Sequence, residues 1–182
     1  MKKALLILAI SLCIVFKSHA QENTVKGLQI AAMKKLEFLT GDWEGRGWIS
    51  MGSEQKEEFL QTERVRFKTD GTSMLIEGLG KDAVTNAVTH DALAIVYFDV
   101  REKKYKFDSH VMQGYHGSYD AMVKQDTFIW KIENPYAGTM VYTITLNEKG
   151  QWFEIGERKK GDEELTQFFE MTLTKNKSQE NE

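Results

Sequence analysis

Residues 36–48 decide the fold, and they read Leu36-Glu37-Phe38-Leu39-Thr40-Gly41-Asp42-Trp43-Glu44-Gly45-Arg46-Gly47-Trp48. In a β-strand, side chains two positions apart point to the same side. Gly41, Trp43, Gly45 and Gly47 therefore share one face of the first predicted strand. Glycine inside a strand is typical of a bend or of a close approach between backbones. One large ring beside bare positions favours the closed end of a small barrel, where the ring fills the floor and the glycines let the strand curl.

The same alternation continues to residue 174 and predicts about ten strands of roughly 7 to 10 residues each. Short turns separate them, for example Asp70-Gly71 and the segment 147–150, and Asn134-Pro135 interrupts the pattern at the single proline. Connections this short join antiparallel neighbours, and a sheet of this many strands tends to close. We therefore expect an all-β protein with one antiparallel barrel domain over residues 41–174.

A short helix is predicted ahead of the barrel, within a leader and capping segment over residues 21–40. Thr24 is a typical helix N-cap. Val25, Leu28, Ala32 and Leu36 recur at intervals of three and four, which gives the helix an apolar stripe. We expect this stripe to cover one end of the barrel, and a membrane-surface or partner helix is the alternative. Residues 175–182 are predicted to form a polar tail.

Residues 1–20 have the parts of a secretory signal peptide, with a predicted cleavage after Ala20. A basic start is followed by an apolar run over residues 4–16 and by the small residues Ser18 and Ala20. The run is shorter than the roughly 20 apolar residues that a membrane-spanning helix needs. We expect a periplasmic or secreted protein with no transmembrane segment in the mature chain. Cys13, the single cysteine, would leave with the signal, so disulfides and thiolate metal sites are not expected.

The charge argues against two classes of partner. The net charge is −3, and loss of the three lysines of the signal would take it to −6. A mildly acidic exported chain is a poor match for nucleic acid and for anionic lipid surfaces. The motifs Gly-x-Ser-x-Gly and His-Glu-x-x-His are absent, so no enzyme class is indicated and no cofactor is assigned.

Several short motifs resemble those of known barrel families. Gly41-x-Trp43, which follows a predicted helix, resembles the opening of the calycin superfamily, which includes lipocalins and fatty-acid-binding proteins. Trp43-x-Gly45-x-Gly47 is similar to the opening of the nitrobindin group of ten-stranded haem-binding barrels. A closer resemblance is to the bacterial lipocalin-like family known as domain of unknown function 1579 (DUF1579), through Leu39-x-Gly41-x-Trp43, Glu77-Gly78-Leu79-Gly80, Phe98-Asp99 with Tyr105, and Phe169-Glu170-Met171.

These resemblances imply a lipocalin-like barrel, and a barrel of this kind hosts many functions. In the nitrobindin group the iron ligand is a histidine in the C-terminal part of the chain. No histidine follows His116 in this sequence. The resemblance therefore carries over no haem-ligand residue.

Two polar residues are predicted to point into the barrel. Gln61 and Glu63 share parity with the apolar Val65 in an alternating strand. An inward carboxylate must be paired or made neutral, and Arg158 or Lys131 on another strand is the expected partner. An acid–amide pair of this kind would give a cavity polar groups that hold a ligand. A fully satisfied core network is the alternative.

The leading hypothesis is a binding protein for a small hydrophobic or amphipathic molecule inside the barrel. A packed core would use the same inward side chains. Only the amount of empty space inside the barrel distinguishes a binding site from a packed core. The predicted contact residues are Trp43, Phe59, Gln61, Glu63, Tyr105, Tyr119, Trp130 and Arg158.

Two other functions remain as alternatives. His110 and His116 flank a predicted turn and are candidate ligands for a metal ion or haem, with Asp108 or Asp120 as a possible carboxylate ligand. Two turn histidines without a ligand role would give the same pattern. An outward patch around Trp48 and Leu60 would instead suit a structural envelope protein that binds another protein on the barrel exterior.

Overall fold

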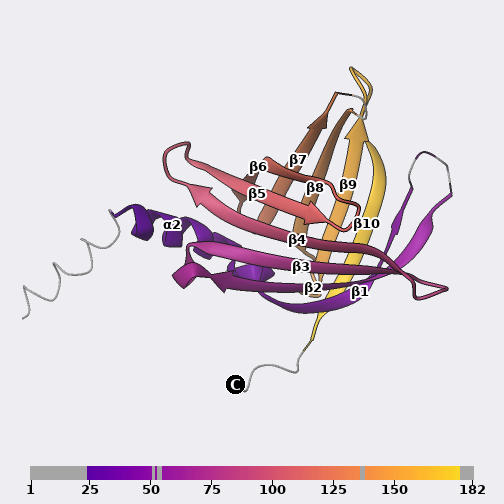
Figure 1. The fold of residues 1–182 in the computed structure, drawn as a ribbon, viewed down its shortest axis with the longest axis horizontal. Coiled ribbons are helices and arrows are strands. Elements are labelled where there is room, and N and C mark those ends of the chain that lie inside the picture. The colour runs from indigo at the N-terminus through magenta and orange to yellow at the C-terminus, as the bar shows by residue number, and fades with distance from the viewer. Residues whose placement is uncertain (1–23, 51, 53–54, 136–137, 177–182) are drawn as a thin grey trace, which may run out of the picture.

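The protein is a closed antiparallel barrel, as the alternation predicts. The computed structural model describes residues 24–50, 52, 55–135 and 138–176, and all statements of structure below concern these residues. Ten strands follow one another in chain order around the barrel, and β1 pairs with β10 to close it (Figure 1). The strands are β1 (Gly41–Ile49), β2 (Glu57–Lys68), β3 (Ser73–Asp82), β4 (Val88–Asp99), β5 (Lys104–Val111), β6 (His116–Lys124), β7 (Thr127–Asn134), β8 (Gly138–Leu146), β9 (Trp152–Lys159) and β10 (Thr166–Lys175).

Two helical segments precede the barrel, namely α2 (Val25–Met33) and the 3₁₀ helix η1 (Lys34–Leu39). Thr24 caps α2 as predicted, because its Oγ1 accepts a hydrogen bond from the backbone N–H of Gly27 at 3.0 Å. A further 3₁₀ turn, η2 (Thr69–Gly71), connects β2 to β3. No helix among the described residues is long and apolar enough to cross a membrane.

The predicted apolar stripe of the first helix is partly wrong. Val25 is 64% exposed and Leu28 is 42% exposed, whereas Met33, Leu36 and Leu39 are fully buried. The chain changes from an α-helix to a 3₁₀ helix after Met33, and residues three apart share one side of a 3₁₀ helix. The buried face therefore follows a period of three along η1, which the α-helical pattern does not predict.

This buried face seals one end of the barrel. Met33, Leu36 and Leu39 belong to the same core cluster as Trp43. The indole Nε1 of Trp43 donates to the carbonyl of Leu39 at 2.9 Å. The hydroxyl of Tyr105 donates to the carbonyl of Ala32 at 2.8 Å. We call this the closed end, and its floor is Trp43, as the sequence predicts.

Residues 81–89 are polar and rich in alanine, yet only the middle of this segment is a loop. Strand β3 continues to Asp82, and β4 begins at Val88. The carboxylate of Asp82 accepts hydrogen bonds from the backbone N–H groups of Val84 and Thr85, at 3.1 and 2.6 Å. This local turn joins the two strands closely enough for their ladder to extend into the segment that looks polar and irregular in the sequence.

The barrel is least continuous between β6 and β7. Their ladder consists of four residue pairs and ends at Ala121 and Trp130. Beyond this point the two strands separate, and Figure 1 shows β5 running across the view while β7, β8 and β9 rise steeply. We call this place the β6–β7 split, and it lies on the side of the barrel away from β1.

Candidate functional site

The interior of the barrel has two halves that differ in exposure. Toward the closed end, inward side chains such as Trp43, Val65, Met74, Phe128 and Leu173 are at most 2% exposed. Farther from the helices, inward side chains are only half-buried, although they face the interior of a closed sheet. A close-packed interior would exclude solvent from them. Solvent therefore reaches this second half, which we call the upper lumen, and its half-buried side chains include Phe59, Tyr119, Trp130, Met140, Tyr142 and Phe169.

An acid–amide pair lies on the inner face, as the alternation of β2 predicts. Gln61 and Glu63 are 6% and 8% exposed. The amide Nε2 of Gln61 donates to Oε1 of Glu63 at 2.7 Å. These two side chains are thus held in a fixed arrangement relative to each other, which is what a binding site for a specific polar group requires.

Two glycines of β3 make room for this pair. Gly78 lies beside Glu63 in the ladder, and Gly80 lies beside Gln61. A Cβ atom at Gly78 would be 2.7 Å from Oε1 of Glu63, and one at Gly80 would be 2.8 Å from Oε1 of Gln61. The carboxyl and the amide can therefore lie flat against the wall, because β3 has no side chains at these two positions.

A second buried carboxyl, Glu154 on β9, is absent from the residues predicted from sequence. It is 6% exposed, and its Oε2 accepts a hydrogen bond from the indole Nε1 of Trp152 at 3.1 Å. The signal was available in the sequence, because Trp152, Glu154 and Gly156 alternate along one face of β9 as Trp43, Gly45 and Gly47 do along β1. The apolar neighbours Phe153 and Ile155 lie on the opposite face of β9, so the alternation around Glu154 does not show in the sequence which face is turned inward.

The two carboxyls are hard to ionise and influence each other. Burial raises the pKa of Glu63 to about 7, although the hydrogen bond from Gln61 acts in the opposite direction. Burial raises the pKa of Glu154 to about 8, and the negative charge of Glu63 adds to this rise. Both carboxyls therefore hold their protons at a higher pH than exposed carboxyls do.

The prediction that Lys131 or Arg158 pairs with Glu63 is wrong. The Nζ atom of Lys131 pairs with Glu133 at 2.7 Å. The guanidinium of Arg158 lies 5.8 Å from the ring centre of Phe168. Within the described parts of the chain, neither Glu63 nor Glu154 forms an ion pair. Protonation replaces the expected cation, since an unpaired charge is costly at a buried position.

An aromatic column forms another part of the wall. The ring of Trp130 on β7 is stacked between Phe107 on β5 and Tyr142 on β8, at centroid distances of 4.4 and 4.3 Å. Both faces of the indole are covered, so the column offers ring edges to a molecule in the lumen. Burial, and then the charge of Glu154, raises the pKa of Tyr142, so its hydroxyl stays protonated.

The remaining predicted contact residues lie in different places. Phe59 stacks on Phe169 at 5.6 Å in the upper lumen. Tyr119 is the next inward residue beyond the end of the β6–β7 ladder, and its ring lies 5.8 Å from that of Trp130. Trp43 and Tyr105 are buried at the closed end. The structure thus separates the predicted set into a floor and an accessible upper part.

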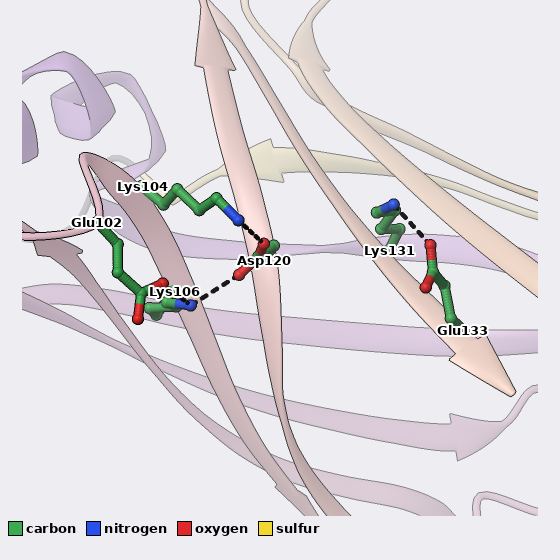
Figure 2. A network of polar contacts seen from close by, with 6 residues as sticks. All are labelled: Glu102, Lys104, Lys106, Asp120, Lys131 and Glu133. Carbon is green, nitrogen blue, oxygen red and sulfur yellow. Dashed lines mark hydrogen bonds and ion pairs between the residues drawn. The ribbon is translucent and has the colours of Figure 1, made fainter.

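Charged side chains surround the β6–β7 split on the outer surface (Figure 2). Asp120 pairs with Lys104 at 2.6 Å and with Lys106 at 2.8 Å, and these two contacts lower the pKa of Asp120 to about 2. The pair formed by Lys131 and Glu133 lies on the neighbouring strand. Charges on strand ends that lack a ladder partner discourage pairing with another chain, so we interpret this cluster as protection of the split.

The two candidate metal ligands meet, as their predicted placement suggests. The rings of His110 and His116 stack with centroids 5.6 Å apart, and both residues are exposed. Asp120 is engaged by lysines, as described above. Among the described residues, no group of three or more histidine, cysteine or acidic side chains is arranged to hold a metal ion.

The outer face has features of its own. Trp48 and Leu60 point outward, but both are half-buried, and the Nζ of Lys56 lies 3.4 Å from the ring centre of Trp48. A groove of about 510 Å³ follows the outside of β1 to β4, with Asp42, Arg64 and Glu77 in its lining. Arg66 binds Asp42 at 2.7 Å, so this groove is mainly a solvated, charged surface.

The fold and its partly open interior define a lipocalin-like barrel in the general sense. Among the solved structures that match this one is "Crystal Structure of Rv2717c from M. tuberculosis", with a TM-score of 0.60 and 12% sequence identity. The match covers 80% of this chain and 98% of that chain, and at such low identity it shows the fold alone. No protein-family model matches the chain, and no curated protein matches it.

Proposed function

We propose that this chain is an exported lipocalin-like protein that holds a small hydrophobic or amphipathic molecule in the upper lumen. The observation that carries the proposal is the contrast in exposure between the two halves of the interior. Solvent reaches Trp130 and Tyr142 inside a closed sheet, whereas Trp43 and Phe128 are buried. A ligand that displaces this solvent would gain the hydrophobic contribution of several aromatic surfaces.

The chemistry of the wall suits an amphipathic molecule. The aromatic column provides apolar contact through Trp130 and Tyr142. Gln61, Glu63 and Glu154 provide a few well-held polar groups, which is the usual composition of a small-molecule site. The β6–β7 split lies beside Tyr119 and Trp130, so it offers a route of entry from the side.

Export and family membership are part of the same proposal. The sequence of residues 1–20 supports a signal peptide, and the motifs around Trp43 support membership of the calycin superfamily near the DUF1579 family. The mass of the protein recovered from its own host tests the first point. Cleavage after Ala20 predicts a chain that begins at Gln21, and a chain that retains Met1 would contradict export by this signal.

Native mass spectrometry tests the binding function most directly. Protein purified from its own host should carry extra mass that is lost on denaturation, and the released compound can then be identified. In parallel, the neutral dye N-phenyl-1-naphthylamine should become fluorescent when it enters the lumen. Trp130→Ala should change the affinity of the dye, whereas the outward Trp48→Ala should leave it unchanged.

The proposal is wrong if the native mass equals that of the chain alone and the dye does not bind. It is also wrong if Trp48→Ala changes the affinity of the dye as much as Trp130→Ala does, because binding would then occur on the outer surface.

A further inference from the structure

The two buried carboxyls have one free oxygen each. Oε1 of Glu63 accepts a hydrogen bond from the amide of Gln61, and Oε2 of Glu154 accepts one from the indole of Trp152. Within the described residues, Oε2 of Glu63 and Oε1 of Glu154 have no hydrogen-bond partner. Neither atom is among the buried polar atoms that lack a partner, so both remain within reach of solvent in the lumen. Two acceptors on nine-tenths-buried side chains are thus available to a ligand.

The charged and titratable groups near this pair do not supply a cation to it. Tyr142 and Tyr119, from β8 and β6, carry a hydroxyl and no basic group. Burial lowers the pKa of His90 on β4, which favours the neutral imidazole. Arg158 on β9 lies over the ring of Phe168. The acid pair is therefore the acidic centre of a lumen with no paired base among its described residues.

Three kinds of polar group on a ligand would interact differently with this centre. A carboxylate would bring a further negative charge beside two carboxyls and would be repelled once either one ionises. A hydroxyl would form ordinary hydrogen bonds with the neutral acids. An ammonium group would donate charge-assisted hydrogen bonds to both free oxygens, and such bonds are about twice as strong as neutral ones. Two free acceptors on buried acids thus favour the ammonium group.

The aromatic column adds a second requirement. The edges of Trp130 and Tyr142 suit the face of a flat ring, because aromatic edges are electropositive and ring faces are electronegative. Tyr142 pairs with Gly156 in the β8–β9 ladder, two residues from Glu154 on the same face, so Glu154 and the column lie close together. A single small molecule can therefore contact both.

We propose that the ligand is an organic cation, an inference that rests on the proposed function. Its flat apolar body would lie against the aromatic column, and its ammonium group would lie between Glu63 and Glu154. The positive charge of the bound cation lowers the pKa values of Glu63 and Glu154 and so favours their ionised forms. The protons that the pair holds near neutral pH then leave to the buffer, while the ammonium group keeps its own.

A matched series of indoles tests this proposal by isothermal titration calorimetry at pH 7. Tryptamine, tryptophol and indole-3-acetate share one ring and end in an ammonium, a hydroxyl and a carboxylate. We expect tryptamine to bind at least about tenfold more tightly than tryptophol and indole-3-acetate. The reason is that a hydrogen bond to a charged group contributes roughly 1.5–3 kcal/mol. The measured enthalpy should also differ between Tris and phosphate buffers, since protons are released on binding.

Variants locate the effect. Glu63→Gln and Glu154→Gln should each weaken tryptamine binding about tenfold and should leave tryptophol binding nearly unchanged. Both replacements keep the shape of the neutral acid, so folding should be retained. Glu44→Gln on the exposed outer side of β1 is the control, and it removes the same charge without changing the affinity of tryptamine.

The outcomes separate this inference from the proposed function. If tryptophol or indole-3-acetate binds as tightly as tryptamine, or if only N-phenyl-1-naphthylamine binds, the cation proposal is overturned and the binding function stands. If none of the four compounds binds, the cation proposal is overturned, and the binding function fails as well when the native mass equals that of the chain alone. If Glu44→Gln weakens tryptamine binding as much as Glu63→Gln does, the attraction is a general effect of charge. This result would also overturn the cation site.

Discussion

The closed end and the upper lumen are built on the same ten strands, yet one is packed and the other admits solvent. At the closed end, large side chains such as Trp43, Phe128 and Leu173 meet across the barrel, and η1 covers them. In the upper lumen, glycines take several inward positions. A Cβ atom at Gly117 would lie 2.4 Å from the hydroxyl oxygen of Tyr119. Glycine thus lets a neighbouring side chain lie against the wall.

The difference also divides stability from function. The closed end buries apolar surface and satisfies its polar atoms, as the hydrogen bond from Trp43 to Leu39 illustrates. The interior also buries Glu63 and Glu154 without a basic partner among the described residues, which costs free energy. Sites that bind ligands commonly contain such locally unfavourable groups, while the rest of the fold supplies the stability.

The largest expected effect comes from removing the floor. Trp43→Ala should lower the free energy of unfolding by about 3–5 kcal/mol, because it leaves a cavity and an unsatisfied carbonyl at Leu39. Trp130→Ala should cost only about 1–2 kcal/mol, because solvent already reaches this ring. Urea unfolding followed by circular dichroism measures both. Equal costs for the two tryptophans would contradict the division of the interior into two halves.

A somewhat smaller effect should appear in the pH dependence of stability. Because Glu63 and Glu154 have raised pKa values in the folded chain, the folded state holds more protons than the unfolded state between about pH 4.5 and pH 8. Stability is therefore greatest below this window and falls as the pH rises through it, by roughly 3 kcal/mol for one such carboxyl. Urea unfolding at several pH values measures this fall.

The double variant Glu63→Gln, Glu154→Gln isolates the contribution of the pair. His90 has a lowered pKa and acts in the opposite direction within the same window, so the difference between the two proteins is the quantity to compare. The wild-type chain should lose more stability than the double variant between pH 5 and pH 8. Identical slopes would mean that the two carboxyls are ionised throughout.

The smallest of these effects concerns the space that β3 leaves for the acid. Gly78→Ala should lower the free energy of unfolding by about 1–3 kcal/mol, because the new methyl group would overlap the carboxyl of Glu63. In a Glu63→Ala background the same substitution should cost much less, since the nearest atoms to that methyl group belong to Glu63. A double-mutant cycle by urea unfolding measures the difference, and strict additivity would contradict the contact.

Much of the fold could be predicted from the sequence because a strand alternates with a period of two. This period predicted the ten strands, the inward position of Trp43 and the inward pair of Gln61 and Glu63, and the structure confirms each of them. The helix was less predictable. Its buried face depends on the change to a 3₁₀ helix after Met33, which the docking of the segment against the barrel decides.

The composition of the candidate site was less accessible. Glu154 lies far from Glu63 in the sequence, and only closure of the barrel brings it near enough for the charge of Glu63 to act on it. The expected pairing of Glu63 with Arg158 or Lys131 failed for the same reason. Parity states on which side of the sheet a residue lies, but it does not state at which height around the barrel two strands meet.

The sequence by itself determined an all-β chain with one face of each strand turned inward, because side-chain alternation is a local property of an extended backbone. Only the tertiary structure decided that solvent reaches the side chains in one half of the interior and not in the other, and that two acids are buried in this interior without a basic partner among the described residues. Those features depend on the register between strands and on the fit of side chains across the barrel, and neither is encoded within a single strand.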